Sequence, residues 1–206
     1  MIINNNLDDL IFLGVDGVGK TTICNQIVAN SNQKIQIAWI RSQHSLAYFI
    51  SLIFFHFGFT HLFIRGGNNE FFLDPRSLKN SSIWSFIEFA SILPLIIKYK
   101  IYSLMGYTLL YDRSLFDTII QNRYFLFPHF KKYEKVLMRL MGNTKRIYLY
   151  ADFETISARK TNLFWPPDFL LFQIDQFNEI AQMLSIPIVD TRNKTVEEIV
   201  AEIRKI

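Results

Sequence analysis

A glycine-rich stretch near the start of the chain constrains its fold more than any other feature. The residues Gly14-Val15-Asp16-Gly17-Val18-Gly19-Lys20-Thr21-Thr22 match the spacing G-x-x-x-x-G-K-[ST]. The apolar run Leu10 to Leu13 precedes them, and a helix-compatible segment follows. Glycines allow such a loop to turn successive backbone N–H groups toward phosphate oxygens, and the following helix adds the positive end of its dipole. The pattern therefore predicts a phosphate-binding loop between a strand and a helix.

The same stretch predicts a triphosphate ligand and a metal ion. In a loop of this kind Lys20 would contact the β- and γ-phosphates of a nucleoside triphosphate. The hydroxyl of Thr21 would bind the Mg²⁺ ion that bridges these phosphates. We expect residues 14–22 as a whole to form the nucleotide site.

The order of apolar segments indicates one α/β domain. The 206 residues suffice for a single core, and no Pro/Gly/Ser-rich linker divides them. Short apolar runs alternate with longer helix-like segments, which is typical of a mostly parallel sheet covered on both faces. The five expected strands are Leu10 to Leu13, Ile35 to Ile40, Thr108 to Tyr111, Arg146 to Tyr150 and Pro187 to Val189.

Helices and loops are expected between these strands. One helix is expected directly after the phosphate loop, and another starts at about Ser82, where Pro94 could kink or divide it. Asp152 can cap a further helix, Phe153 to Lys160. The remaining expected helices are Ser45 to Phe57, Lys131 to Met141 and Thr195 to Ile206. Surface loops are expected at Arg65 to Asn69, Asp74 to Ser81 and Asn162 to Asp168.

The distribution of charge and the single cysteine limit the kinds of partner and the location that we expect. The net charge of +4 is spread along the chain, and its one dense basic stretch, Lys131 to Lys135, fits a solvated helix face, so we expect no nucleic-acid partner. The single cysteine, Cys24, cannot form an internal disulfide and is expected to pack as a small apolar residue. No secretory signal is recognised, and a cytoplasmic location is expected.

The apolar residues are unevenly distributed. Twenty phenylalanines occur, and apolar residues concentrate in Leu46 to Phe63 and Ile83 to Leu104. The first segment is short and the second contains Glu88, Pro94 and two lysines, so neither is a good membrane span. Burial in the core and in a subunit interface is the favoured interpretation, with peripheral membrane contact as the alternative.

A charged pair follows the third expected strand. Asp112 and Arg113 would lie at its carboxyl end, which in an open parallel sheet faces the same crevice as the phosphate loop. Asp112 could bind Mg²⁺ through water or orient Arg113, whose planar guanidinium suits a phosphate. A purely structural ion pair is the equally plausible alternative.

Taken together, these segments resemble the thymidylate kinase family of nucleoside monophosphate kinases. The acidic phosphate loop with Asp16, the run Asp112-Arg113-Ser114 with Thr118 six places after the Asp, and the order of the C-terminal segments carry the resemblance over nearly the whole chain. It implies a three-layer α/β/α P-loop kinase fold with a five-stranded, mostly parallel sheet and a small lid at about 158–170. It also implies a homodimer packed through the apolar helices.

The resemblance implies transfer of a phosphoryl group from ATP, with Mg²⁺, to dTMP or a related nucleoside monophosphate. Lys20, Arg113 and the lid cation Arg159 would be catalytic, and Thr21 and Asp112 would hold the metal. The acceptor would contact Asp16, Arg41, Arg113, Thr118 and Gln121. An exposed Arg41 and a solvated Gln121 are the alternatives to the roles of these two residues.

Other acceptors and other functions stay open. The segment Trp84 to Leu93 contains no arginine for a base, and the lid segment is apolar, which would suit a different and less polar acceptor. A nucleotide-binding module without kinase activity is the remaining alternative. The string Asn193-Lys194-Thr195-Val196 lacks the Asp of a guanine-specific switch.

Overall fold

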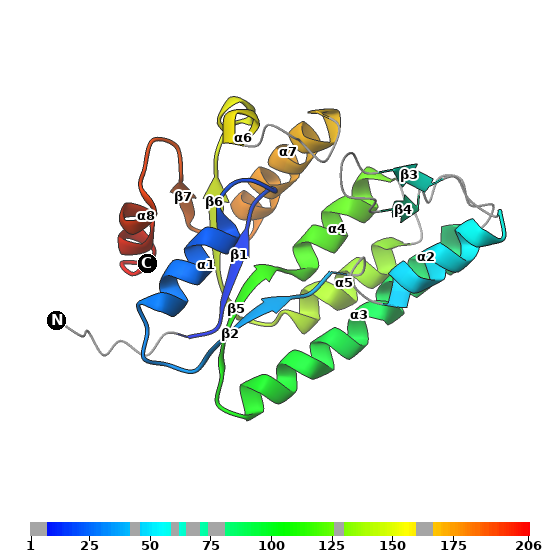
Figure 1. Ribbon diagram of the computed structural model, residues 1–206, viewed down its shortest axis with the longest axis horizontal. Helices are drawn as coiled ribbons and strands as arrows, with labels where there is room; N and C mark the ends of the chain where they lie inside the picture. Colours follow the sequence, from blue (N-terminus) through cyan, green and yellow to red (C-terminus); the bar gives the residue numbers. More distant parts are fainter. Residues whose placement is uncertain are drawn as a thin grey trace.

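The fold is a three-layer α/β/α sandwich around a parallel sheet (Figure 1). The computed structural model describes residues 8–41, 46–58, 62–64, 71–73, 81–125, 130–159 and 167–206. Among these residues, five strands pair side by side in the order β2-β5-β1-β6-β7, every neighbouring pair being parallel. The strands of the sheet are β1 (Leu10–Leu13), β2 (Ile35–Trp39), β5 (Thr108–Arg113), β6 (Lys145–Tyr150) and β7 (Ile188–Asp190).

Helices cover both faces of this sheet. α1 and α8 pack together on one face, and α3, α4, α5 and α7 lie on the other (Figure 1). The helices are α1 (Lys20–Ala29), α2 (Leu46–His56), α3 (Ser81–Leu104), α4 (Leu115–Tyr124), α5 (Lys131–Leu140), α6 (Phe153–Arg159), α7 (Pro167–Met183) and α8 (Val196–Ile203). The predicted fold class and all five predicted strands are confirmed, with strand ends shifted by one or two residues.

The sheet register places the expected site residues along one edge. Ile11 of β1 pairs with Tyr111 of β5, and Leu13 of β1 pairs with Tyr148 of β6. Gly14 therefore follows β1 at the edge where β5 ends in Asp112 and Arg113. Parallel strands present their carboxyl ends to one crevice, so the pairing itself brings the phosphate loop and the charged pair together.

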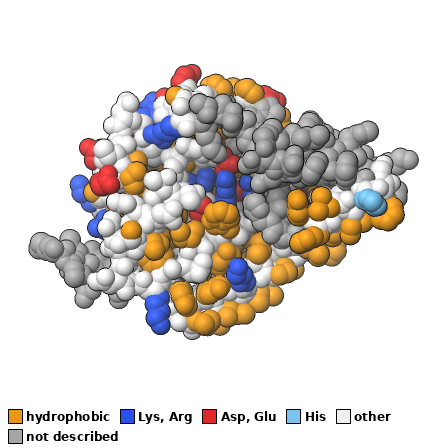
Figure 2. All heavy atoms as spheres, in the orientation of Figure 1, with side chains coloured by type: hydrophobic (Ala, Val, Ile, Leu, Met, Phe, Trp, Pro, Cys, Tyr) orange, Lys and Arg blue, Asp and Glu red, His pale blue; other side chains and the backbone are white. Residues whose placement is uncertain are grey.

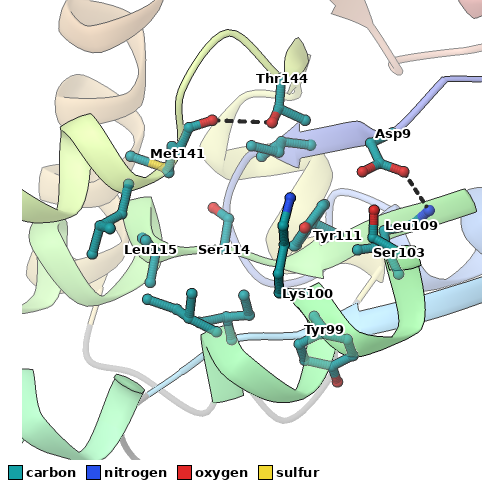
Figure 3. Close-up of a pocket in the computed structure, with 14 residues that line it drawn as sticks. Asp9, Tyr99, Lys100, Ser103, Leu109, Tyr111, Ser114, Leu115, Met141 and Thr144 are labelled. Atoms are coloured by element: carbon teal, nitrogen blue, oxygen red, sulfur yellow. Dashed lines mark hydrogen bonds between the residues drawn. The ribbon is translucent and has the colours of Figure 1, made fainter. Parts of the chain in front are cut away.

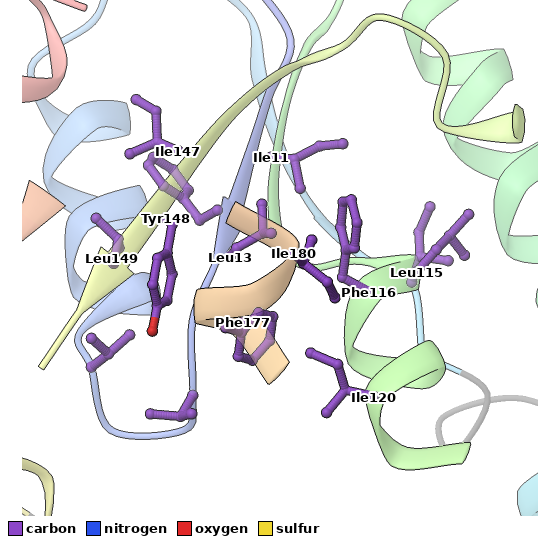
Figure 4. Packing of buried hydrophobic residues seen from close by; sticks show 14 of the residues in the cluster. Ile11, Leu13, Leu115, Phe116, Ile120, Ile147, Tyr148, Leu149, Phe177 and Ile180 are labelled. Carbon is purple, nitrogen blue, oxygen red and sulfur yellow. The ribbon is translucent and has the colours of Figure 1, made fainter. Parts of the chain in front are cut away.

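A buried core fixes α4 and α7 against the sheet. Phe116 and Ile120 of α4 and Phe177 of α7 pack toward Leu13 of β1 (Figure 4). The rings of Tyr148 and Phe177 stack with centroids 5.9 Å apart. Phe116, Ile120, Phe177, Leu13 and Tyr148 are all buried. This close packing fixes the position of α4 on the sheet, beside the strand that leads into the phosphate loop.

Most predicted helices are confirmed, with corrections at their ends. α3 runs through Pro94 without division, so the suggested break there is wrong. α6 begins after Asp152, whose side chain accepts a hydrogen bond from the backbone N–H of Thr155 at 2.8 Å. α8 starts at the predicted capping box but ends at Ile203 instead of Ile206. Cys24 is buried, and the basic stretch lies in α5 with Lys131, Lys132 and Lys135 exposed, as expected.

The sequence analysis did not predict β3, β4, α4 or α7, and some of its expected loops lie outside the described residues. β3 (Leu62–Ile64) and β4 (Phe71–Leu73) form an antiparallel hairpin that the sequence pattern did not indicate. α7 begins at Pro167, inside a stretch expected to be a loop. The expected loop at 65–69, residues 74–80 of the second loop and residues 160–166 of the lid lie outside the described residues.

The apolar helices α2 and α3 keep a large apolar surface uncovered. Leu46, Phe49, Ile53 and Phe57 are exposed along α2 and its end, and Ile83, Phe86, Ile97 and Ile101 are exposed on α3. Figure 2 shows hydrophobic side chains gathered along this side of the molecule. Within the described residues, Ser82–Leu104 is long and apolar enough to cross a membrane by length and composition alone. The same helix packs on β2 and β5, as a covering helix of the sheet does.

The capping box of α8 offers a test of local stability. The Thr195 hydroxyl accepts a hydrogen bond from the backbone N–H of Glu198, and the Glu198 carboxylate accepts one from the backbone N–H of Thr195. We expect Thr195→Ala to lower the free energy of unfolding by about 1 kcal/mol, measured by urea denaturation. Thr195→Ser keeps the hydroxyl and is the control. An equal loss in both variants would contradict the role of the cap.

Candidate active site

The phosphate loop approaches the sheet so closely that it requires glycine. Gly14, Gly17 and Gly19 have φ angles of 138°, 97° and 106°, values that residues with a side chain rarely adopt. A Cβ at Gly14 would lie 2.6 Å from the carbonyl oxygen of Leu149 in β6. The loop is therefore seated against β6, and α1 starts directly behind it at Lys20.

Lys20 is held beneath the loop that precedes it. Its Nζ donates hydrogen bonds to the carbonyl oxygens of Gly14 and Val15, the second at 3.0 Å. Burial lowers the pKa of Lys20 and Arg113 lowers it further, whereas Asp117, Asp16 and Asp112 raise it. The lysine thus lies near three carboxylates, with its amine bonded to carbonyl oxygens of the phosphate loop.

Thr21 and Asp112 form a polar pair that fits a divalent cation. The Thr21 hydroxyl donates a hydrogen bond to Asp112 Oδ2 at 2.8 Å, although 91 residues separate the two in the chain. Asp112 is 2% exposed, and its Oδ1 has no hydrogen-bond partner among the described residues. A hydroxyl and a buried carboxylate with a spare oxygen are hard oxygen ligands of the type that Mg²⁺ takes, so the residues fit the metal that the motif implies.

Arg113 joins the phosphate loop to α4. Its Nη1 forms ion pairs with Asp16 Oδ1 of the loop and with Asp117 Oδ1 of α4, the latter at 3.2 Å. Burial alone would raise the pKa of Asp16, but the positive charges of Arg113, Lys20 and Arg41 outweigh it and hold that pKa far below its usual value. Burial lowers the pKa of Arg113, whereas Asp16 and Asp117 raise it by more. Asp16 and Arg113 are therefore both ionised at neutral pH.

Arg41 lies in the same cluster and not on the surface. Its Nη2 donates a hydrogen bond to Gln121 Oε1 at 3.3 Å, and both side chains are buried. The alternatives of an exposed Arg41 and a solvated Gln121 are therefore wrong. Thr118, one turn before Gln121 on α4, is also fully buried. The structure thus connects Arg41 and Arg113 with Asp16 of the phosphate loop, and Gln121 with Arg41.

Two carboxylates of this cluster were missed by the sequence analysis. Asp117 accepts a hydrogen bond from the backbone N–H of Ser114 at 2.9 Å, closing a capping box at the start of α4. The spacing Ser-x-x-Asp and the i, i+4 spacing from Arg113 were both available as signals. Burial lowers the pKa of Arg41 and Arg113 lowers it further, whereas Asp16, Asp117 and the buried Glu88 of α3 oppose this shift. No local sequence signal pointed to Glu88.

Arg159 lies on the other flank of the phosphate loop. At the end of α6 it donates hydrogen bonds to the carbonyl oxygen of Thr191 at 2.6 Å and to that of Val18 at 3.4 Å. These bonds tie α6 and the segment after β7 to the loop. The structure therefore separates Arg159 from the Arg113 cluster while keeping it on the loop.

A separate cavity lies away from these residues. It has a volume of about 180 Å³ and is lined from α3, β5 and the end of α5, with Tyr99, Lys100 and Tyr111 among its walls (Figure 3). The Lys100 side chain extends across it in Figure 3. None of the residues expected in the site lines this cavity. The charged groups expected to act on a phosphate lie at the phosphate loop, so we do not assign the reaction to this cavity.

Comparisons with solved structures match nearly the whole chain. A deoxyadenosine kinase from M. mycoides with bound dATP superposes with a TM-score of 0.60 at 14% identity, covering 97% of this chain and 98% of that one. The same enzyme with the products dCMP and a flexible dCDP gives 0.58 at 12% identity, over 96% and 97%. Thymidylate kinase from Candida albicans gives 0.60 at 17% identity, over 96% and 90%.

These similarities show a P-loop kinase fold, as the sequence predicted. No protein-family model and no curated protein matches the chain.

Gly14 provides a test of the loop's geometry. We expect Gly14→Ala to lower the melting temperature and to weaken binding of a fluorescent ATP analogue, because the added Cβ meets the Leu149 carbonyl oxygen and φ is positive. Gly106→Ala is the control, since Gly106 also has a positive φ of 80° but no atom within 4 Å of the added Cβ. Equal melting temperatures and affinities in both variants would show that the close approach does not matter.

Proposed function

We propose that this protein is an ATP-dependent kinase that transfers the γ-phosphoryl group to a small nucleoside-type acceptor. The observation that carries the proposal is that the phosphate loop and the start of α1 meet two different polar groups. Thr21 is hydrogen-bonded to Asp112, whereas Asp16 is paired with Arg113 and is also stabilised by the charge of Arg41. A donor site and an acceptor site would thus share the phosphate loop.

The donor half uses Lys20 and the backbone of residues 14–22. Lys20 would exchange its bonds to loop carbonyls for bonds to the β- and γ-phosphates. Thr21 and Asp112 would hold Mg²⁺, which when bound neutralises phosphate charge. Arg159, bonded to the loop at Val18, would close the same site from the lid. Phosphoryl transfer depends on positioning and charge more than on a covalent catalyst, and these residues supply both.

The acceptor half consists of Asp16, Arg41, Arg113, Thr118 and Gln121. Two solved structures that share the fold are kinases of deoxynucleosides and of thymidylate, by their names. On the resemblance to thymidylate kinases the acceptor is dTMP or a related nucleoside monophosphate, with Arg113 and Arg41 as phosphate ligands. A nucleoside hydroxyl is the second candidate, favoured by the carboxylates that surround both arginines. We place the enzyme in the cytoplasm, as one domain with a lid at about 158–170.

Removal of Lys20 tests the donor site. We expect Lys20→Ala to lower the rate of ADP formation by roughly 10² to 10³, because a preorganised charge at a developing anionic centre is lost. Coupled ADP release over a panel of nucleosides and monophosphates measures it, with circular dichroism to check folding. Lys98→Ala, on the exposed face of α3, is the control. Near wild-type turnover in Lys20→Ala would contradict the donor assignment. Nucleotide binding without ADP formation by the wild type would instead indicate a binding module.

The exposed apolar residues of α2 and α3 support a proposed homodimer. On α3, Ile83, Phe86, Leu93, Ile97 and Leu104 are exposed at helical spacing, so they form one stripe. The one carboxylate in α2 and α3 is Glu88, which is buried, so this surface brings no exposed acidic group to a twofold contact. A second copy packed on these helices would bury on the order of 2,000 Å² in total, as an obligate interface does.

A charge placed on this surface tests the dimer. Phe49 is 63% exposed, whereas Phe54 packs against Trp84 with centroids 6.2 Å apart, so Phe49 is the better probe. We expect Phe49→Asp to shift the mass measured by light scattering from dimer to monomer. Leu171→Asp on α7, also exposed, is the matched control and should leave the mass unchanged. A wild-type protein that is monomeric at every concentration would contradict the homodimer.

A further inference from the structure

One residue of β5 is extra in the pairing of that strand with β2. The two strands keep a regular parallel register up to Ala38, which pairs with Tyr111. The next residue of β2, Trp39, pairs with Arg113 and skips Asp112. A bulge of this kind re-aims the side chains that follow it, and bulges are frequent beside active sites. This one lies at the carboxyl ends of the strands, the edge of the sheet at which the phosphate loop begins.

The bulge determines how Arg41 enters the site. The backbone N–H of Ile40 donates a hydrogen bond to the carbonyl oxygen of Arg113 at 2.9 Å, so pairing with β5 resumes beyond the bulge. Trp39 is 46% exposed, whereas Ile40 and Arg41 are both buried, so the alternation of inward and outward side chains stops here. Arg41 is thereby turned inward, where its Nη2 donates a hydrogen bond to Gln121 Oε1 of α4 at 3.3 Å.

Tyr99 of α3 contacts both strands at the bulge. Its hydroxyl oxygen accepts a hydrogen bond from the backbone N–H of Trp39 at 2.9 Å. Within the described residues β2 is an edge strand, so this hydroxyl bonds the strand on the side that has no neighbouring strand. The ring of Tyr99 meets the ring of Tyr111 in β5 edge to face, with centroids 6.4 Å apart. Tyr99 is 6% exposed, and a hydrogen bond that is buried in this way is hard for water to replace.

Building on the kinase function proposed above, we propose that Tyr99 is a positioning residue that keeps Arg41 turned into the acceptor half of the site. It acts through the backbone, because its hydroxyl bonds Trp39 and the next residue, Ile40, is bonded to the backbone of Arg113. The proposed donor residues belong to the phosphate loop, α1 and the end of β5, and Tyr99 belongs to α3. Loss of the hydroxyl therefore weakens use of the acceptor and spares the donor site.

The first experiment removes the hydroxyl of Tyr99 and keeps its ring. Tyr99→Phe is assayed with ATP, Mg²⁺ and whichever of the four common 2′-deoxynucleosides or their 5′-monophosphates the wild type phosphorylates fastest. We expect KM for that acceptor to rise about three- to tenfold, the effect of one hydrogen bond, while KM for ATP stays within about twofold. Tyr102→Phe is the matched control. It removes a hydroxyl from the same helix that has no hydrogen-bond partner among the described residues, and it should change neither KM.

The second experiment asks whether Tyr99 acts through Arg41. In a double-mutant cycle, Tyr99→Phe should raise the acceptor KM of the wild type and have no further effect in the Arg41→Ala background. Where turnover is too slow, thermal protection by the acceptor replaces KM. The melting temperatures of the four proteins provide the comparison, because a merely structural loss would add in both backgrounds. A rise in acceptor KM that persists in full without the Arg41 side chain would overturn the inference.

Hydrogen exchange tests the bulge without any turnover. The amides of Trp39 and Ile40 donate to Tyr99 and Arg113, so in Tyr99→Phe both should exchange about tenfold faster than in the wild type. Tyr102→Phe should leave their exchange unchanged. Wild-type exchange rates in Tyr99→Phe would show that the hydroxyl does not hold the bulge, whatever the kinetics.

The outcomes separate the role of Tyr99 from the kinase function. Phosphoryl transfer with the same acceptor KM in wild type and Tyr99→Phe would overturn the role of Tyr99 and support the kinase function. An equal rise in KM for acceptor and ATP would also overturn it, because it would indicate a general loosening of the site. No phosphoryl transfer to any acceptor would contradict the kinase function and the acceptor role of Arg41, whereas hydrogen exchange would still decide whether Tyr99 holds the bulge.

Discussion

The site depends on the ion pairs that Arg113 makes with Asp16 and Asp117. They connect the phosphate loop to the end of β5 and the start of α4. Removing one partner of such a buried pair leaves an uncompensated charge and typically costs about 3 to 5 kcal/mol. Arg113 is partly exposed, so the loss would fall below that range. The same contact that orders the acceptor half thus fixes the phosphate loop.

The proposed donor and acceptor halves of the site differ in how they are assembled. The proposed donor half is almost entirely local: a glycine loop, the lysine that follows it and one threonine, completed by a single carboxylate from the neighbouring strand. The proposed acceptor half combines the loop with residues at the ends of β2 and β5 and with α4. Arg159 adds a third anchor at Val18, on the opposite flank. Acceptor choice can therefore change without change in the donor loop.

Much of the fold was readable because its signals are local. The strands are continuous apolar runs, and the capping box at Thr195 and the cap at Asp152 mark two helix starts. The hairpin of β3 and β4 was missed because two three-residue strands carry too little pattern. α7 was not predicted, because a proline pair marks its start and its stability depends on packing, as between Phe177 and Tyr148.

The sequence by itself determined the phosphate loop, the roles open to Lys20 and Thr21, and the edge of the sheet at which Asp112 and Arg113 would lie. Each of these follows from residues close in the chain and from the rule that parallel strands end on one side. Only the tertiary structure decided that Arg41 and Gln121 are buried together and that Arg113 reaches Asp16 as well as Asp117. These contacts depend on how distant segments of the chain pack on the sheet, and the charges of such neighbours set the pKa values in a buried cluster.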